Sequence, residues 1–342
     1  MMVVAPRIVK LLINRPEVEN FLQERDPTKR IGIARNLLKN ELLDRSEVMI
    51  ELRKSLEEMN SESDIKAIWG RSLDLLDLQV ELSREAGNIS ANRVVDIPTL
   101  EAIRRIYGRG CHLATEICHL LRGGYADGAE ARWRTLYELE VISKFICIAG
   151  DDTAERYLSY PSVEMEIFYK SAKQYFERLN RELTLDEEKE YQNAKDRLFS
   201  EEEKVKSLCK RFGPCFKKDN GWAACAIRKK KPQFSYIEAL TGYSKSRVLY
   251  KEANFPIHGG PMAASFRKGL PHMGYILVGP SRYGLKDVIG RTAISLESLT
   301  RDLITQFNDE TIRAIYDFQY VLTEEITEAA KDAEMTLGPF KP

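Results

Sequence analysis

The stretch that decides the fold is PTLEAIRRIYGRGCHLATEICHLL (98–121), followed by RGGYADGAEARWRTLYELEVISKFICIAG (122–150). In its first half, apolar residues recur every three or four positions, which is the period of a helix with one buried face. Asp96 and Pro98 predict the start of this helix. Gly123 and Gly124 predict its end, because glycine readily adopts the left-handed backbone that closes many helices. The stretch therefore predicts two long helices folded back on one another.

The second of these helices carries charge on its apolar face. Arg134 and Glu138 lie four residues apart on the stripe that Val141 and Phe145 form, so the two side chains are neighbours. Charges on an inward face need partners, because an unpaired charge is costly to remove from water. Two interpretations stay open: a centre of chemistry, or an ion pair that only holds the bundle together.

The rest of the chain continues the helical pattern. Residues 63–87 and 287–326 are amphipathic at helical spacing, and the capping box TLDE from Thr184 predicts a charged helix that runs to about Phe212. No alternating strand pattern of convincing length occurs, and YILVG (275–279) is the one short candidate. We predict an all-α fold, a multi-helix bundle with an N-terminal helical appendage. The expected domains are the appendage at 1–90 and the bundle at 95–335.

Composition narrows the class of protein. The chain has 342 residues, of which 43% are hydrophobic, and its 52 basic and 52 acidic residues give a formal net charge of zero. This balance excludes a protein that binds nucleic acid by its overall charge, although local basic patches remain possible. No apolar run is long enough for a membrane span, and the N-terminus lacks the pattern of a signal peptide. We therefore expect a cytoplasmic protein without a membrane partner, which self-associates through exposed helix faces.

A second polar feature lies in SRVLYKEANFPIHGG (246–260). His258 is preceded by Pro256 and followed by two glycines, so it is expected where a helix gives way to a turn, facing a cleft. A histidine can serve as general acid or base at neutral pH, and an arginine can hold a phosphate with two parallel hydrogen bonds. His258 and Arg134 are therefore candidates for one centre.

The segments LLRGGYADGAEARWRTLYELEVISKFI (120–146) and YKEANFPIHGG (250–260) together resemble a bacterial helical family, domain of unknown function 5677. In that family a helix that ends in glycine precedes an Arg-x-x-x-Glu helix, and a later helix ends in a His-Gly pair. The resemblance covers about residues 98 to 310. It implies four catalytic residues: Arg134, Glu138, Tyr250 and His258.

This family is similar in style to HEPN domains, which include many RNases of bacterial toxin and phage-defence systems. Those enzymes place an Arg and a His, with four to six residues between them in the chain, at the scissile phosphate, where the RNA 2′-hydroxyl attacks. Arg267 and His272 have that spacing and form an alternative catalytic pair, although Gly269 and Pro271 predict a loop there rather than a helix. The resemblance implies a metal-independent RNase without a cofactor, with RNA and a partner protein of a defence system as its partners.

A different class of function explains the same residues. In a non-catalytic interaction or scaffold protein, Arg134, Glu138 and His258 form a buried structural centre. A catalytic centre is expected to open to solvent in a positively charged groove, whereas a structural centre is expected to be closed.

Three further patterns bear on binding. The basic run Arg228-Lys229-Lys230-Lys231, with aromatic residues nearby, predicts contact with nucleic-acid phosphate, and a solvated loop is the alternative. Glu116-x-x-His119 resembles half of a di-iron site, but a second such motif is missing. The gaps between Cys209, Cys215 and Cys225 lack the paired spacing of zinc sites. We therefore expect no metal.

Overall fold

The structure is a computed structural model, and it describes residues 62–92, 96–265, 267–270, 278–307 and 309–337 together with residues 26, 29 and 276. Every regular element in these ranges is a helix, which confirms the all-α prediction. The first 61 residues of the expected appendage, apart from residues 26 and 29, lie outside the description, as do Tyr275 and Leu277 of the YILVG stretch. The other three residues of that stretch are described, and none of them is in a strand. The division into an appendage and a bundle domain stays a prediction.

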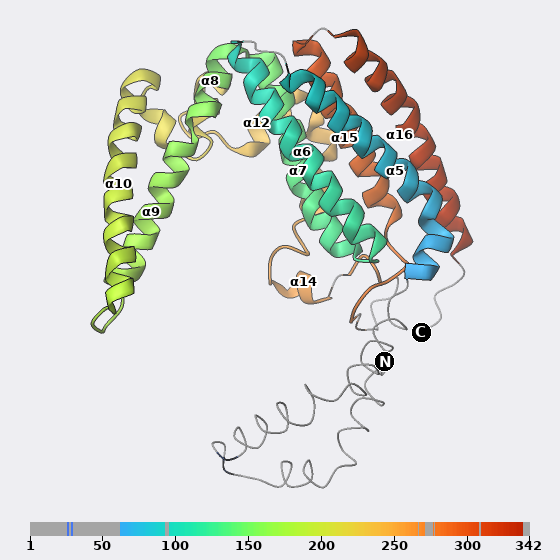
Figure 1. Ribbon diagram of the computed structural model, residues 1–342, viewed down its shortest axis with the longest axis horizontal. Coiled ribbons are helices and arrows are strands. Elements are labelled where there is room, and N and C mark those ends of the chain that lie inside the picture. Colours follow the sequence, from blue (N-terminus) through green and yellow to red (C-terminus); the bar gives the residue numbers. More distant parts are fainter. Residues whose placement is uncertain are drawn as a thin grey trace.

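Five long helices lie side by side and form the bundle (Figure 1). They are α5 (Glu62–Ala91), α6 (Pro98–Arg122), α7 (Ala126–Ala149), α15 (Lys286–Gln306) and α16 (Glu310–Thr336). The predicted pair α6 and α7 packs together, α15 packs on both, and α5 with α16 closes the other side. One continuous hydrophobic core runs through all five helices.

The turn between α6 and α7 is the one that the two glycines predict. Gly124 adopts the left-handed conformation (φ 76°), and its carbonyl accepts a hydrogen bond from the Ser281 N–H at 2.9 Å. The predicted start at Pro98 is also correct, but Asp96 does not cap the helix. Asp151 does so from the start of a later helix, because its Oδ1 accepts from the Thr99 N–H at 3.1 Å and from the Thr99 hydroxyl at 2.6 Å.

A helical hairpin projects from one end of the bundle (Figure 1). The short helix α8 (Asp151–Ser159) leads into α9 (Pro161–Glu177), which pairs with α10 (Leu185–Phe212). The capping box at the start of α10 is confirmed: the Thr184 N–H donates to Glu187 Oε2 at 2.8 Å, and the Glu187 N–H donates to the Thr184 hydroxyl at 3.3 Å.

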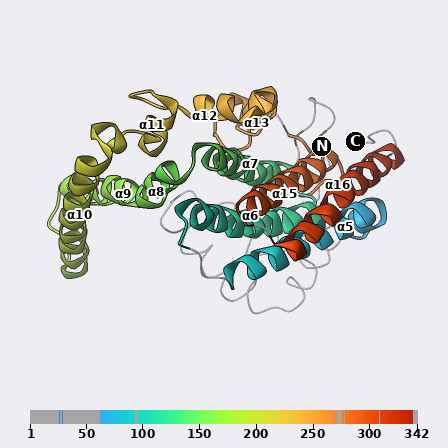
Figure 2. The ribbon, with the colours of Figure 1, turned by 90° about the horizontal axis from the view of Figure 1, so that it is seen from above.

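Short helices connect this hairpin to α15. They are η2 (Pro214–Lys217), η3 (Gly221–Ala223), α11 (Ala224–Ile227), α12 (Phe234–Thr241), η4 (Tyr243–Ser246), α13 (Arg247–Glu252) and α14 (Pro261–Ser265). Figure 2 shows α11, α12 and α13 following one another along one side of the molecule, next to α7. Since α12 packs directly on α7, this segment brings the residues of the second motif to the Arg-x-x-x-Glu helix.

Candidate functional site

Four polar side chains meet where α13 and the turn after it reach α7. We call Arg134, Glu138, Tyr250 and Asn254 the Arg134 centre. Arg134 donates from Nε to Asn254 Oδ1 and from Nη2 to the Tyr250 hydroxyl, both at 2.6 Å. The Tyr250 hydroxyl in turn donates to Glu138 Oε1 at 2.7 Å, and Arg134 Nη2 lies 3.0 Å from the same oxygen. The structure thus joins three of the predicted catalytic residues in one hydrogen-bonded unit.

This centre is partly open to solvent. The side chains of Arg134 and Glu138 are 23% and 27% exposed, whereas Tyr250 is 8% exposed. The Arg134 guanidinium lies 4.6 Å above the centroid of the Tyr250 ring. Its Nη1 has no hydrogen-bond partner among the described residues, so we infer that this nitrogen faces water. The guanidinium is therefore held on one side and available on the other.

Burial and the Glu138 carboxylate raise the pKa of Tyr250 to about 12. The phenol therefore keeps its proton at neutral pH. It acts as a hydrogen-bond donor to Glu138 and as an acceptor from Arg134, and it is unsuited to the role of general base.

Aromatic side chains hold Tyr250 in place. The Phe234 ring stacks on it with centroids 5.2 Å apart, and Tyr137 contacts it at 5.8 Å. Tyr137 also donates to Glu238 Oε1 at 2.8 Å, and Glu238 Oε2 accepts from Arg247 at 2.8 Å. These contacts fasten α12 and α13 to α7, so the Arg134 centre rests on packed helices.

His258 lies at the edge of this centre. Its backbone N–H donates to the Asn254 carbonyl at 3.2 Å, so His258 stands one helical turn beyond Asn254. The residue is exposed, and in the described part of the chain its imidazole makes no hydrogen bond or ion pair with the Arg134 centre. The structure therefore places the fourth predicted residue next to the centre along the chain and open to solvent.

The alternative pair is only half described. Arg267 Nη1 donates to the Ala263 carbonyl, and His272 lies outside the described residues. The pairing of Arg267 with His272 stays a prediction. The four basic residues 228–231 are all exposed, in the turn that follows α11.

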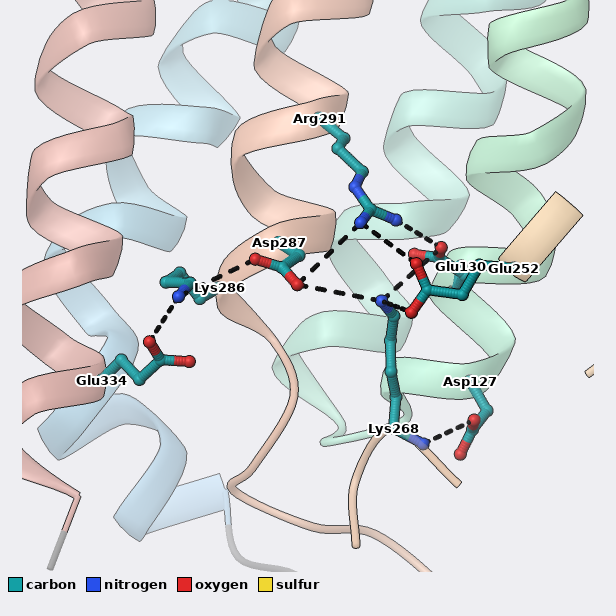
Figure 3. Close-up of polar contacts among 8 residues, drawn as sticks. All are labelled: Asp127, Glu130, Glu252, Lys268, Lys286, Asp287, Arg291 and Glu334. Carbon is teal, nitrogen blue, oxygen red and sulfur yellow. Dashed lines mark hydrogen bonds and ion pairs between the residues drawn. The ribbon is translucent and has the colours of Figure 1, made fainter. Parts of the chain in front are cut away.

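An ion-pair network that the sequence did not indicate lies close by (Figure 3). Arg291 of α15 donates to Glu130 Oε1 of α7 at 2.6 Å, and Lys268 Nζ lies 3.6 Å from the same oxygen. Both cations also contact Glu252 of α13, at 3.4 Å from Arg291 and 3.1 Å from Lys268. Asp287 lies 3.9 Å from each cation. We call these five residues the Lys268 network.

The Lys268 network is largely removed from water. The side chains of Glu130, Lys268 and Arg291 are 2%, 7% and 12% exposed. Burial raises the pKa of Glu130, and the opposing effect of Lys268 and Arg291 does not cancel it. Glu252 lies between Tyr250 and Asn254 in the chain, so the segment that completes the Arg134 centre is also fixed by this network.

Two signals in the sequence could have revealed more of the site. Asn254 lies four residues after Tyr250 and four before His258, which is the spacing of one helix face. Glu130 lies four residues before Arg134 on α7, in the same row as Glu138. The Lys268 contact has no such signal, because 138 positions separate it from Glu130.

The outer face of α6 carries a separate charged cluster. Glu116 contacts His112 at 3.0 Å, Arg132 at 2.8 Å and Arg109 at 3.9 Å. In the ranges that the structure covers, no group of three or more His, Cys, Asp or Glu side chains has an arrangement that could hold a metal ion. None of the helices described there is long and apolar enough to cross a bilayer.

Comparisons with known proteins add one relationship. No curated protein and no solved structure matches the chain. A sequence model described as a family of unknown function (DUF5677) matches residues 100–269, a region that contains Arg134, Glu138, Tyr250 and His258. Over these residues the chain is thus similar to family DUF5677, which confirms the resemblance drawn from its two motifs.

Proposed function

We propose that this protein is a metal-independent RNase of HEPN-like style, an effector of a bacterial defence or toxin-type system. The observation that carries the proposal is the Arg134 guanidinium, which is held by Tyr250, Glu138 and Asn254 but keeps Nη1 for a ligand. An exposed histidine lies one turn away on the segment that supplies two of those contacts. An oriented arginine beside an accessible histidine suits a phosphodiester.

In the proposed reaction the RNA 2′-hydroxyl attacks the adjacent phosphorus. The bond from phosphorus to the 5′-oxygen breaks, which leaves a 2′,3′-cyclic phosphate and a free 5′-hydroxyl. His258 takes the proton from the attacking 2′-hydroxyl, and a water molecule gives one to the leaving 5′-oxygen. Arg134 binds the non-bridging oxygens and offsets the charge that grows on them.

The other members of the Arg134 centre position the arginine. Asn254 accepts from Nε, and the Tyr250–Glu138 pair fixes Nη2. With three fixed contacts, the guanidinium has little rotational freedom left to lose when a phosphate binds. Such preorganisation is a large part of electrostatic catalysis.

A second function is favoured by the same contacts. Arg134, Tyr250 and Asn254 join α7 to the segment around α13, so the centre can equally serve as a clamp in a non-catalytic interaction or scaffold protein. In that case Arg134→Ala leaves Glu138 without its cation and mainly lowers stability. The exposed His258 then has no role, and its removal changes nothing.

The two functions are separated by one set of variants. Wild type, His258→Ala, Arg134→Ala and the control His112→Ala, an exposed histidine on α6, are incubated with total RNA and with tRNA in the presence of EDTA. Thermal melting of each protein is recorded in parallel. We expect wild type and His112→Ala to cleave RNA, and both other variants to melt as folded proteins without activity. Absence of cleavage by wild type, with a large drop in the melting temperature of Arg134→Ala alone, would favour the clamp.

A further inference from the structure

A positively charged pocket of about 300 Å³ lies where α8, the end of α10, η2 and α11 meet. Its charged lining consists of Arg156, Arg228, Lys229 and Lys230, and no Asp or Glu is among the lining residues. We call it the basic pocket. Four cations around one hollow, in a chain with no net charge, concentrate positive potential at this place.

The floor of the basic pocket is built around Arg156. Its side chain is 12% exposed, and it is fixed by hydrogen bonds from Nε to Asp152 at 2.8 Å and from Nη1 to the Phe212 carbonyl at 2.8 Å. The guanidinium lies 4.8 Å from the centroid of the Phe212 ring. Its Nη2 has no partner in the described part of the chain. Arg156 is thus a fixed donor with one nitrogen to spare.

The rim of the pocket is held in a costly backbone conformation. Arg228 is left-handed (φ 56°, ψ 38°) at the end of α11, a position where glycine is the usual residue. The turn is closed by hydrogen bonds from Arg228 N–H to the Cys225 carbonyl at 3.1 Å and from Lys229 N–H to the Ala224 carbonyl at 3.2 Å. The left-handed conformation is strained for an arginine because its Cβ approaches the following carbonyl oxygen, and such strain clusters at functional sites.

The three rim cations are available for a ligand. Arg228, Lys229 and Lys230 are exposed, and none has an acidic partner in the described ranges. Lys229 Nζ lies over the ring of Tyr236, 5.3 Å from its centroid, and that ring is 39% exposed on α12. The rim thus offers cations without acidic partners beside an exposed aromatic residue, which is the combination that single-stranded nucleic acid contacts.

The basic pocket is close to the Arg134 centre along the chain. Lys230, which lines the pocket, is four residues from Phe234, so their Cα atoms are at most about 14 Å apart. The Phe234 ring stacks on Tyr250, which binds Arg134. Figure 2 shows α11, α12 and α13 in this order on one side of the molecule. One strand of RNA that leaves the Arg134 centre along α12 therefore reaches the pocket.

We propose that the basic pocket is an exosite that binds backbone phosphates of the RNA strand entering the Arg134 centre. This inference rests on the proposed RNase function for the identity of the strand. It assigns Arg156 to the floor of the phosphate site and Arg228, Lys229 and Lys230 to its rim. The pocket supplies affinity, and the Arg134 centre supplies the reaction.

The test measures binding separately from cleavage. The probe is a fluorescein-labelled single-stranded RNA with 2′-O-methyl groups, which lacks the attacking hydroxyl, and binding is followed by anisotropy over a range of salt concentrations. Wild type is compared with R228Q/K229Q/K230Q. The control K189Q/K204Q/K206Q removes the same charge from α10, where each of these lysines pairs with an acidic residue three positions earlier.

We expect the rim variant to raise the Kd at least tenfold in about 0.1 M salt, because three phosphate contacts are lost. The slope of log K against log salt should fall by about 2, since each contact to a single strand contributes about 0.7. The control should stay within twofold of wild type. Equal Kd values of wild type and the rim variant for the RNA probe would overturn the exosite. It would also be overturned if wild type bound free ATP but did not bind the RNA probe.

These outcomes are independent of the cleavage assay. If the protein binds RNA through the rim residues but cleaves no RNA, the exosite stands and the RNase proposal is contradicted. If wild type cleaves RNA, and the rim variant cleaves and binds RNA as well as wild type does, the RNase proposal stands and the exosite is contradicted.

Discussion

Arg291 and Glu130 form an ion pair of 2.6 Å in which the two side chains are only 12% and 2% exposed. The pair joins α15 to α7 one turn before Arg134, and Lys268 and Glu252 extend it to the loop after α14 and to α13. The helix that carries the Arg134 centre is thus tied by charge to three other parts of the chain. Breaking this pair should therefore affect the whole bundle.

Arg291→Met should lower the free energy of unfolding by about 3 kcal/mol. The substitution keeps an apolar side chain beside Trp133, 5.2 Å from the guanidinium in the native protein, but it leaves the Glu130 carboxylate buried without its nearest cation. This loss of stability is at the lower end of the range for removing one partner of a buried ion pair, because Lys268 Nζ remains 3.6 Å from Glu130 Oε1. Urea unfolding followed by circular dichroism measures it.

Two comparisons sharpen this prediction. Arg71→Met breaks an exposed pair with Glu325, whose side chains are 73% and 55% exposed, and should cost less than about 1 kcal/mol. The double variant Arg291→Met/Glu130→Gln should regain most of the loss, since no buried charge is left alone. An Arg291→Met protein that unfolds like Arg71→Met would contradict the role given to the pair.

Glu140→Gln should remove a pH dependence from the stability of the bundle. Glu140 is 2% exposed between α7 and α15 and accepts a hydrogen bond from Ser295 at 2.7 Å. Burial raises the pKa of its carboxyl from 4.5 to about 7, although Ser295 opposes the shift. Between these two values the native state holds a proton that the unfolded state has released, so stability falls as pH rises through this window.

The expected loss from this one group is about 3 kcal/mol, and it is complete above about pH 7. The stability difference between Glu140→Gln and wild type should therefore grow in favour of the variant from pH 5 to pH 7. Glu190→Gln, at an exposed position on α10, is the matched control and should show a constant difference. Chemical denaturation at several pH values measures the difference in the free energy of unfolding between Glu140→Gln and wild type. A difference that does not change with pH would contradict the prediction.

Gly124→Ala and Gly108→Ala should change stability in opposite directions. At Gly124 the backbone is left-handed, and an added Cβ would lie 2.9 Å from the Ser281 carbonyl oxygen and 2.7 Å from Ile65. The variant should lose at least about 1–2 kcal/mol. Gly108 lies on an exposed side of α6 with nothing within 4 Å of an added Cβ, so alanine should gain about 0.5–1 kcal/mol. Melting temperatures that move in the same direction would contradict the different roles given to the two glycines.

Local signals in the sequence predicted the elements that depend on neighbours along the chain. The apolar period predicted α6 and α7, Gly124 predicted the turn between them, and the Thr184 capping box predicted the start of α10. Each depends on residues within one or two helical turns, where spacing determines which side chains meet.

Contacts between distant segments could not be read in this way. Asp151 caps α6 across 52 positions, and Lys268 meets Glu130 across 138. Such pairs depend on how the helices pack. From the sequence alone, each of the 52 acidic residues is an equally good candidate partner for a given lysine. The motif resemblance supplied what spacing could not, since it placed Arg134 and Tyr250 in one site.

Tyr250→Phe tests whether the Arg134 centre works by positioning. The substitution keeps the ring that stacks on Phe234 but removes the hydroxyl between Arg134 and Glu138. We expect a stability loss of about 1 kcal/mol for the missing hydrogen bonds. If the proposed RNase function is correct, kcat should fall about 10- to 100-fold, because a guanidinium that has lost one of its fixed contacts binds the scissile phosphate less accurately.

The pH profile separates positioning from proton transfer in this variant. Because the pKa of Tyr250 is raised to about 12, the phenol stays protonated across the working range of the assay, and its loss should lower activity equally at every pH from 5 to 9. Asn254→Ala removes the contact to Arg134 Nε and should lower activity with the same unchanged profile. His258→Ala, in contrast, should remove the pH-dependent limb of the profile. A Tyr250→Phe enzyme whose profile loses a limb would make the phenol itself the proton carrier and would leave His258 without its proposed role.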